Sequence, residues 1–405
     1  MKVAAIISEY NPFHLGHEYQ IREIRRLLGD DTAVIAIMSG NFTQRAEPAV
    51  CDKTIRAEAA VNCGVNLVLE LPFPYSMSSA EFFAKSGVRI ADRIGVVDYL
   101  AFGSECGDIS ELSNIAAAMS SDEYNLTLYA LMSSDRCKDI GYPELCQMAL
   151  SRVYGKEITR EFFTPNNILG IEYIKAISAE GGSITPITVR RCGSGYHDII
   201  NPMSEFQSAT AIREELLAQN ISALDYVPEN ARQIFMKAIE NGKMPSDVTR
   251  LDLSVISSFR LNSPVADVDI QDASGGLYNR LCDMSAEANS ISSLTSMAET
   301  KKYTKTRIKR AIWNTYFGVT SSDVRSLPAY TQVLAMDSVG RSVLKRIKKV
   351  SDFPVITKPS SYRELGEDVC RQKELSNKAD AIFGLTLKCA NTGRFSLTFT
   401  PYVKD

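Results

Sequence analysis

The first twenty residues of the chain, MKVAAIISEYNPFHLGHEYQ, constrain its fold more than any other stretch. Val3 to Ile7 is an apolar run rich in β-branched residues, which predicts a buried strand. Pro12 ends that strand, because proline lacks a backbone donor and restricts the residue before it. A helical pattern follows from Glu18 to Leu28. The sequence therefore predicts a strand, a tight loop and a helix, with a His-Leu-Gly-His segment where the helix begins.

Two of the three histidines of the protein, His14 and His17, lie at this predicted helix start. The first turn of a helix offers unpaired N–H groups and the positive end of the helix dipole, which suits a phosphate group. Gly16 would allow the backbone to approach such a ligand closely. Two imidazoles could also donate hydrogen bonds to the phosphate oxygens and stabilise a leaving pyrophosphate. The alternative is that the histidines only cap the helix, but their pairing in one short segment favours phosphate binding.

Strand-like and helix-like segments alternate along the first half of the chain. Buried strands are predicted at residues 32–38, 66–70, 98–102 and 184–189. This alternation predicts an α/β fold with a parallel sheet. Polar loops follow two of these strands, at Ser39–Arg45 and at Gly103–Glu105. Both loops are candidates for a ligand site, because ligands bind at the carboxyl edge of such sheets, although Gly103 is equally compatible with a simple turn.

Two further helix starts hold candidate ligand-binding residues. Asn167 follows Thr164 and Pro165 and is suited to cap a helix. Ser208 and Thr210 open another helix, where hydroxyl and N–H groups can bind an anion, and Arg213 one turn later can add a bidentate contact. The alternative for this second segment is an N-cap followed by a solvent-exposed arginine.

Composition limits the class of protein. A chain of 405 residues is long for one domain, so two domains are expected. Its 45% hydrophobic and 23% charged residues are ordinary for a soluble globular protein, and neither a membrane span nor a signal peptide is predicted. The nine cysteines form no C-x-x-C pair, which argues against a zinc site and for reduced thiols in the cytoplasm. No metal site built from protein residues is predicted.

A domain boundary is expected near residue 220. Residues 1–220 are predicted to form the α/β domain, with a helical insertion at about 108–160. Residues 221–405 are predicted to form a mainly helical domain, in which the pattern does not assign a structure to the tail.

The second half contains two basic stretches, of which the second spans 341–349. The net charge of −3 shows that this clustering is not an effect of composition. A solvated helix face is the alternative, but the pattern favours contact with RNA phosphates. The cations of the first stretch are Lys301, Lys302, Lys305, Arg307, Lys309 and Arg310.

Several motifs together resemble a known family. His14-x-Gly16-His17 and the later Ser/Thr-rich helix start that ends in Arg213 are similar to the two signatures of the HxGH nucleotidyltransferase superfamily. Its members have a Rossmann-like α/β domain and attack the α-phosphate of ATP with release of pyrophosphate. Longer segments narrow the resemblance, over essentially the whole chain, to the bacterial tRNA(Met) cytidine acetate ligase family. These segments are residues 8–17, MSGNFTQRAEP at 38–48, residues 52–58, LELP at 69–72, SAEFFA at 79–84, FGSE at 102–105, NILGIEY at 167–173, GSGYHD at 193–198 and SATAIR at 208–213.

This resemblance implies an ATP-dependent ligase. Members of the family are understood to activate acetate as acetyl-adenylate and to pass the acetyl group to N4 of the wobble cytidine of elongator tRNA(Met). ATP is then a substrate, Mg²⁺ is expected beside it, and His14 and His17 are the implied catalytic residues. Leu15 stands where a polar residue is more usual, at a variable position of the motif. The implied ATP-binding residues are Ile7, Ser8, Glu9, Tyr10, Asn11, Pro12, Phe13, His14, Leu15, Gly16, His17, Glu18, Tyr19, Gln20, Gly103, Asn167, Arg190, Arg191, Ser208, Thr210 and Arg213.

The sequence leaves the transfer step and two other functions open. The wobble base must leave its stack to enter the site, and an Asp, a Glu or His197 could accept its N4 proton. A zinc deaminase is excluded, because its H-x-E…P-C-x-x-C signature is missing. The other functions are a cofactor-pathway adenylyltransferase acting on a small phosphorylated substrate, and a non-catalytic RNA-binding protein. The expected partners are acetate and elongator tRNA(Met), with neither DNA nor a membrane.

Overall fold

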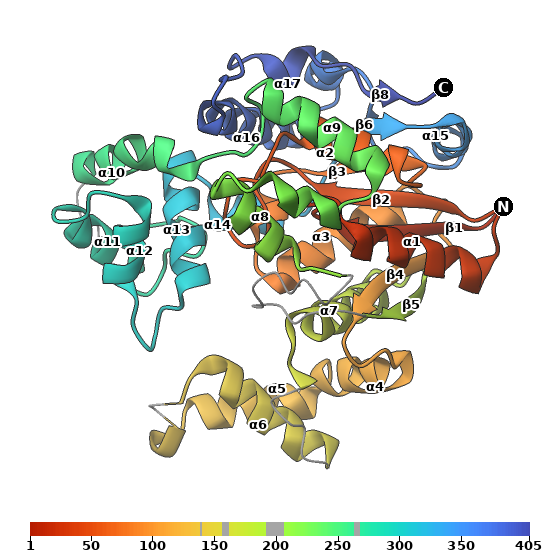
Figure 1. Cartoon of the computed structure of the whole chain (residues 1–405). Helices are drawn as coiled ribbons and strands as arrows, with labels where there is room; N and C mark the ends of the chain where they lie inside the picture. Colours follow the sequence, from red (N-terminus) through yellow and green to blue (C-terminus); the bar gives the residue numbers. More distant parts are fainter. Residues whose placement is uncertain (138–139, 156–161, 192–205, 263–267) are drawn as a thin grey trace.

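The computed structural model contains a central sheet with helices on both faces (Figure 1). The structure describes residues 1–137, 140–155, 162–191, 206–262 and 268–405. The strand order is β5-β4-β1-β2-β3-β6-β7, with β8 beside β6. The strands are β1 (Val3–Ser8), β2 (Ala33–Ser39), β3 (Leu67–Leu71), β4 (Tyr99–Ser104), β5 (Thr185–Arg190), β6 (Thr331–Met336), β7 (Val355–Ile356) and β8 (Tyr402–Val403).

Helices connect and surround these strands. Those of the first half are α1 (Leu15–Leu28), α2 (Lys53–Asn62), α3 (Ala80–Arg93), α4 (Ile109–Met119), α5 (Asp122–Met132), α6 (Tyr142–Tyr154), α7 (Pro165–Glu180) and α8 (Ala209–Leu217). Those of the second half are α9 (Glu229–Glu240), α10 (Asp252–Leu261), α11 (Leu277–Ser285), α12 (Ile291–Ala298), α13 (Lys305–Phe317), α14 (Ser321–Arg325), α15 (Ser338–Val350), α16 (Glu367–Phe383) and α17 (Phe395–Thr398). Helices α4 to α6 occupy the segment expected to be an insertion and lie at the bottom of Figure 1. No helix in the described part of the chain has the length and apolarity needed to cross a membrane.

The central strands form because both of their faces are buried. Val3, Ala5 and Ile7 of β1 point to the face covered by α3 and α7, while Ala4 and Ile6 point to the face covered by α1 and α2. The alternation follows the two-residue period of a strand, and continuous apolar runs are typical of parallel strands covered on both sides. Strands β1 to β5 are all parallel. The predicted α/β fold with a parallel sheet is therefore confirmed.

The strand order reverses at β1. The chain passes from β1 outward through β2 and β3, and then returns to place β4 on the other side of β1. In open α/β sheets such a reversal leaves a crevice at the carboxyl ends of the two strands, and ligands bind there. The loops that follow β1 and β4 face this crevice.

The second half of the chain completes the same sheet. Strand β6 pairs antiparallel with β3, with a register shift between Val68 and Leu69, and β7 and β8 both pair with β6. The sequence analysis did not predict β6 and β7, and β8 lies in the tail that the pattern did not assign. Strand β6 covers the backbone groups that β3 would otherwise leave unpaired at the sheet edge. The sheet therefore crosses the boundary expected near residue 220.

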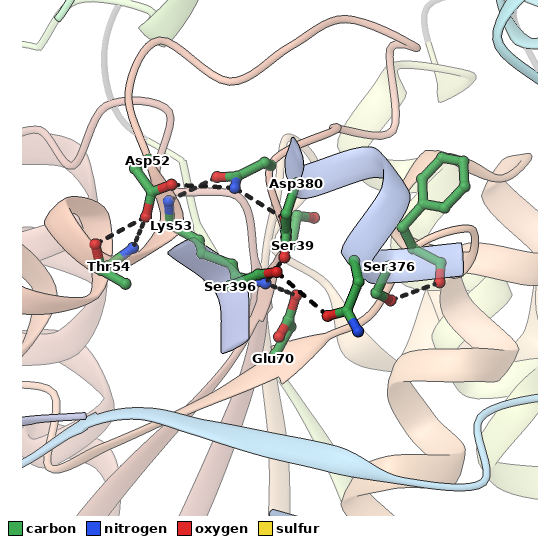
Figure 2. Close-up of polar contacts among 12 residues, drawn as sticks. Ser39, Asp52, Lys53, Thr54, Glu70, Ser376, Asp380 and Ser396 are labelled. Atoms are coloured by element: carbon green, nitrogen blue, oxygen red, sulfur yellow. Dashed lines mark hydrogen bonds and ion pairs between the residues drawn. The ribbon is translucent and has the colours of Figure 1, made fainter. Parts of the chain in front are cut away.

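Helices α10 to α13 form a separate cluster, at the left of Figure 1, that packs against the loops after β2 and β3. The ring of Phe42 lies 5.1 Å from that of Trp313, and the ring of Phe73 lies 5.0 Å from that of Phe317. Helix α16 packs on the same loops, and a buried ion cluster joins it to α2 and β3, as Figure 2 shows. The second half therefore supports the loops at the carboxyl edge of the sheet.

Candidate active site

Two adjoining cavities open at the carboxyl ends of β1 and β4. The smaller cavity, of about 40 Å³, lies between the start of α1 and the ends of β4 and β5. The larger cavity, of about 400 Å³, lies beside the segments that follow β1 and β2 and is also lined by α3 and α7. His17, Gln20, Gly103 and Arg191 line both. The cavities are therefore two parts of one site at the strand-order reversal, the usual place for a ligand in this architecture.

Most of the loop predicted to bind ATP lines this site. Ile7, Ser8, Glu9, Tyr10 and Asn11 line the larger cavity, whereas His14, Gly16 and Tyr19 line the smaller one. Four residues of the loop line neither cavity, namely Pro12, Phe13, Leu15 and Glu18. Phe13 instead packs inside, with its ring centroid 4.9 Å from that of Tyr10 and 5.5 Å from that of His17. Phe13 thereby supports the histidine pair from the interior of the protein.

The two histidines lie against each other where α1 begins. Their ring centroids are 3.8 Å apart, and the rings are tilted by 32°. Nδ1 of His14 accepts a hydrogen bond from the Gly16 N–H at 3.1 Å, and Nδ1 of His17 accepts one from the His14 N–H at 3.2 Å. This is a capping box made of two imidazoles. Nδ1 of each histidine therefore caps the helix, as the alternative interpretation proposed. The other ring nitrogen, Nε2, is left for a ligand.

The surroundings keep both imidazoles neutral. The pKa of His14 is lowered to about 3, first by burial and then by the charges of Arg191 and Arg213. The pKa of His17 also lies well below its ordinary value, because of burial first and then because of His14 and Arg191. A neutral imidazole whose Nδ1 accepts a hydrogen bond carries its proton on Nε2. The site therefore presents two neutral N–H donors, and its positive charge comes from arginine.

Arg191 follows β5 and reaches both cavities. Its backbone N–H donates to the carbonyl of Ser104 at 3.0 Å, and a Cβ added at Gly103 would lie 3.2 Å from its Cγ. Glycine at position 103 therefore leaves room for the Arg191 side chain at the end of β4. Arg190 lines only the smaller cavity. The next part of the predicted site, Gly193–Asp198 with His197, lies outside the described residues.

Arg213 ties the start of α8 to the loop after β1. Its Nη1 donates to the carbonyl of Asn11 at 2.7 Å, and its Nη2 donates to Oγ1 of Thr210 at 3.2 Å. Oγ of Ser208 accepts from the Ala211 N–H at 3.1 Å and so acts as the N-cap of α8. The cap alternative holds for Ser208, but Arg213 is not a solvated arginine. It holds the loop after β1 and acts electrostatically on His14.

Asn167 lies beside the site but lines neither cavity. Its Oδ1 accepts from the N–H groups of Glu105 and Cys106 at 3.0 and 3.2 Å, and its Nδ2 donates to the carbonyl of Phe162 at 2.8 Å. Glu105 in turn accepts from the Thr164 hydroxyl at 2.6 Å. Asn167 therefore positions the loop after β4, and its contact with ATP stays a prediction.

The larger cavity contains residues that the sequence did not identify as ligand contacts. Gln44 and Arg45 come from the loop after β2, and Phe83, Phe102 and Tyr173 supply aromatic side chains. The polar loop at 39–45 was the one available signal for the first pair. The aromatic residues look like ordinary core residues in the sequence, because nothing local shows which of them meet at a cavity.

Arg56 holds the loops after β1 and β2 together. Its side chain is fully buried. The guanidinium donates to the carbonyls of Glu9 at 2.6 Å, Ser39 at 3.1 Å and Gly40 at 2.5 Å. One buried cation therefore helps to fix the relative position of these two loops, and hence the shape of the larger cavity.

Part of the predicted RNA-binding run has structural partners. The guanidinium of Arg310 pairs with the Asp272 carboxylate at 3.1 Å, and both side chains are largely buried. Arg307 donates to the carbonyl of Asp272 at 3.1 Å, and Lys302 Nζ donates to the carbonyl of Gly275 at 2.9 Å. These three cations hold the loop before α11. Their contact with RNA stays a prediction.

The remaining cations of this run are Lys301, Lys305 and Lys309. Lys301 and Lys305 are exposed. Lys309 pairs with Glu47, and Trp313 Nε1 donates to the carbonyl of Ala46 at 3.0 Å. Both partners belong to the loop that carries the cavity residues Gln44 and Arg45. The basic helix α13 therefore packs directly on the wall of the larger cavity.

The fold and the site define a nucleotidyltransferase, because a His-x-Gly-His helix start lies where the strand order of a parallel sheet reverses. The chain belongs to the HIGH Nucleotidyl Transferase family, which it matches over residues 1–395. Within that family the chain belongs with the tRNA(Met) cytidine acetate ligases. It is 37% identical over 374 residues to the protein of that name from Caldanaerobacter subterraneus subsp. tengcongensis, covering 91% of each chain. It is 36% identical over 397 residues to the one from Caldicellulosiruptor saccharolyticus, covering 96% of this chain and 95% of the other. The resemblance seen in the sequence is thus confirmed.

The fold is similar to that of a solved structure. The crystal structure of Thermotoga maritima TmcAL bound with alpha-thio ATP aligns with a TM-score of 0.90 at 31% sequence identity, over 100% of this chain and 99% of the other. The apo form of the same protein aligns with a TM-score of 0.91 at 30% identity.

Proposed function

We propose that the protein uses ATP to activate acetate as acetyl-adenylate and then transfers the acetyl group to N4 of the wobble cytidine of elongator tRNA(Met). The observation that carries this proposal is the double cavity, in which a nucleotide-type site with a histidine pair joins a larger space beside a basic helix. The names of the relatives and the ATP analogue bound by the Thermotoga protein support the same reaction.

The start of α1 is the expected seat of the triphosphate. Helix N–H groups, the Nε2–H groups of His14 and His17, and the guanidinium of Arg191 would stabilise the charge that grows on the leaving pyrophosphate. Acetate and ATP are both anionic, so the arginines also offset their mutual repulsion. Acetate held with one oxygen in line with the α-phosphorus then attacks without any covalent protein intermediate.

Mg²⁺ is proposed to accompany ATP. Among the residues that the structure describes, no three His, Cys, Asp or Glu side chains form a group able to hold a metal ion. Mg²⁺ in phosphoryl-transfer sites is commonly held by phosphate oxygens and water with only one or two carboxylates. The site therefore fits an ion that arrives with the nucleotide, where it would neutralise part of the triphosphate charge.

The tRNA is expected to approach along α13. Lys301 and Lys305 are exposed at its start, and Lys309 lies at the cavity loop. Phosphates bound along this helix would bring the anticodon near the larger cavity, and such binding weakens steeply with salt.

The test is a nucleoside analysis. The protein would be incubated with ATP, isotope-labelled acetate and elongator tRNA(Met), and the tRNA then digested and examined by mass spectrometry. Labelled N4-acetylcytidine should form, with AMP and pyrophosphate released in equal amounts. A tRNA with uridine at the wobble position is the control. Absence of labelled acetylcytidine would reject the proposal, and an AMP adduct of a small phosphorylated compound would favour an adenylyltransferase.

A further inference from the structure

We propose that the larger cavity receives the cytosine base of the tRNA, that Arg45 and Glu9 recognise its hydrogen-bonding edge, and that Glu9 takes the proton that N4 loses. This inference rests on the proposed function, because it gives the second substrate a place in the same site. It adds a base-binding subsite, a specificity-determining residue and a proton acceptor.

The size and lining of the cavity suit a base that has left its stack. Its volume of about 400 Å³ lies within the range of roughly 300–1,000 Å³ found for small-molecule sites. Phe83, Phe102 and Tyr173 line it, and extruded bases are commonly held against such aromatic side chains. The cavity joins the nucleotide cavity at His17 and Arg191. The acetyl group of acetyl-adenylate formed at this junction would therefore face the base.

Glu9 is fixed through one carboxylate oxygen and presents the other. The backbone N–H of Gln44 donates to Oε1 at 2.9 Å. No described residue donates a hydrogen bond to Oε2. The backbone of Glu9 is itself held by Arg56, which donates to its carbonyl at 2.6 Å. A carboxylate held in this way at a cavity wall is suited to accept an N–H of a ligand.

The guanidinium of Arg45 interacts electrostatically with the Glu9 carboxylate. Burial lowers the pKa of its guanidinium, the Glu9 carboxylate raises it, and Arg213 lowers it again. Cytosine presents two acceptors, O2 and N3, next to the N4 donor, which matches an arginine beside a carboxylate. Uracil has the acceptor O4 where cytosine has the donor N4–H₂, and the donor N3–H where cytosine has the acceptor N3. With uracil, an acceptor would face the Glu9 carboxylate and a donor would face the Arg45 guanidinium. The Arg45 and Glu9 pair therefore favours cytosine.

The loop that carries Arg45 is held in place from the second half of the chain. Asn41 Nδ2 donates to Asp380 of α16 at 2.9 Å, and Asn41 Oδ1 accepts from the Lys53 N–H at 2.7 Å. On its other side, Trp313 of α13 donates to the loop backbone. The helix expected to bind RNA phosphates and the residue expected to read the base are thus connected through one loop.

The transfer step balances with these groups. The N4 lone pair forms a bond to the acetyl carbonyl carbon, and the bond from that carbon to the phosphate oxygen breaks, with its electron pair staying on AMP. One N4 proton passes to the Glu9 carboxylate and from there to solvent. The products are N4-acetylcytidine and AMP, and no other reactant is required.

Chemically prepared acetyl-adenylate separates transfer from activation. Wild type, Glu9→Gln and Arg45→Gln would each be mixed with acetyl-adenylate and tRNA(Met), and each would be assayed separately for acetate-dependent ATP–pyrophosphate exchange without tRNA. We expect the ratio of transfer rate to exchange rate to fall by about 100-fold in Glu9→Gln, the usual size of a general-base effect. In Arg45→Gln the ratio should also fall, and tRNA with a wobble uridine should compete with tRNA(Met) better than it does for wild type.

Glu81→Gln is the matched control, because this residue lies on α3 with its side chain 51% exposed and pairs with Lys85. It should change neither rate, and thermal unfolding should show all variants folded. If exchange and transfer fall together in Glu9→Gln and Arg45→Gln, these residues serve acetate or ATP, and the base-binding proposal is wrong. Unchanged transfer in both variants would also overturn it. Failure of the proposed function is distinguishable, since the wild type itself would then neither exchange pyrophosphate nor acetylate tRNA.

Discussion

The same substitution at two lysines of one buried region is expected to lower the free energy of unfolding at Lys53 and to preserve or raise it at Lys373. The ammonium of Lys53 lies 2.6 Å from a carboxylate oxygen of Glu70 and 2.6 Å from one of Asp380, and no side chain of the three is more than 7% exposed (Figure 2). Lys373 of α16 is also fully buried, but its ammonium has no hydrogen-bond partner among the described residues. Lys→Met removes the charge and leaves an unbranched side chain that is one heavy atom shorter.

Lys53→Met leaves two carboxylates in the interior without their cation. Burial by itself would lower the pKa of Lys53, but Asp380 and Glu70 raise it above its ordinary value, as expected of a charge that is compensated. Removing one partner of a buried ion pair costs about 3–5 kcal/mol. We expect the free energy of unfolding to fall by that amount, and Tm to fall by roughly 6–10 °C at about 2 °C per kcal/mol.

Lys373→Met removes a charge that the fold disfavours. Burial, and then the charge of Lys53, lower the pKa of Lys373 to about 8. The unfolded chain has a lysine pKa of about 10.4, so the folded state binds this proton less tightly by roughly 3 kcal/mol. The wild type therefore loses stability as the pH falls from about 10.4 to about 8, and the variant lacks this loss. At pH 7 its free energy of unfolding should be unchanged or higher, by at most about 3 kcal/mol.

Denaturant unfolding of the three proteins at pH 7 measures both effects, and equal m-values would show that the same structure unfolds in each case. If Lys373→Met lost as much stability as Lys53→Met, the Lys373 ammonium would have to be paired, and the reasoning would be refuted for that residue. If Lys53→Met were neutral, the ion cluster would add no net stability, and α16 would be held by its other contacts, such as the hydrogen bond from Asn41 to Asp380.

Four further outcomes are expected. His14→Ala should lower acetate-dependent ATP turnover by about 100-fold or more, as for the loss of one transition-state donor, while tRNA binding measured by filter retention stays close to wild type; equal loss of both would contradict the division of labour. Replacing Lys301 and Lys305 by Ala should weaken tRNA binding and reduce the slope of log affinity against log salt by up to about 2, with pyrophosphate exchange unchanged. Because the pKa of His14 is lowered to about 3, the folded chain binds this proton less readily than the unfolded one. The ligand-free wild type should therefore lose stability as the pH falls below about 6.5, and His14→Asn should lose less in acid titrations followed by circular dichroism. Gly103→Ala should raise KM for ATP, because the added Cβ would lie 3.2 Å from Arg191 Cγ; an unchanged KM would show that this side chain moves freely.

The first five strands could be predicted because each is a short apolar run ended by glycine, proline or polar residues. Strand β6 could not, because its place is decided by pairing with β3, more than 250 residues earlier in the chain. The same limit applies to the site. His14 and His17 lie three positions apart in the sequence and were found, whereas Arg45 and Tyr173 meet only at a cavity formed by remote elements.

Charge patterning located the basic run but not its partners. Arg310 and Lys305 look alike in the sequence, yet one is buried against Asp272 and the other lies 3.4 Å from Glu299 with its side chain 62% exposed. Burial of a charge depends on whether an opposite charge is present in the fold. Such a partner, dozens of residues away, gives no local signal, so a count of cations overstates the surface available to RNA.

The loop after β2 connects the two positions at which activation and transfer are proposed to occur. Its residue Asn41 donates to both Asp52, which caps α2, and Asp380 of α16, while Gln44 donates to Glu9 of the nucleotide loop. Helix α16 is therefore connected to the larger cavity by two hydrogen-bonded residues. An acyl-adenylate is readily hydrolysed, so the acceptor base must reach it in the site where it forms. A loop held by both halves of the chain keeps these two positions fixed relative to each other, which a flexible linker between independent domains would not do.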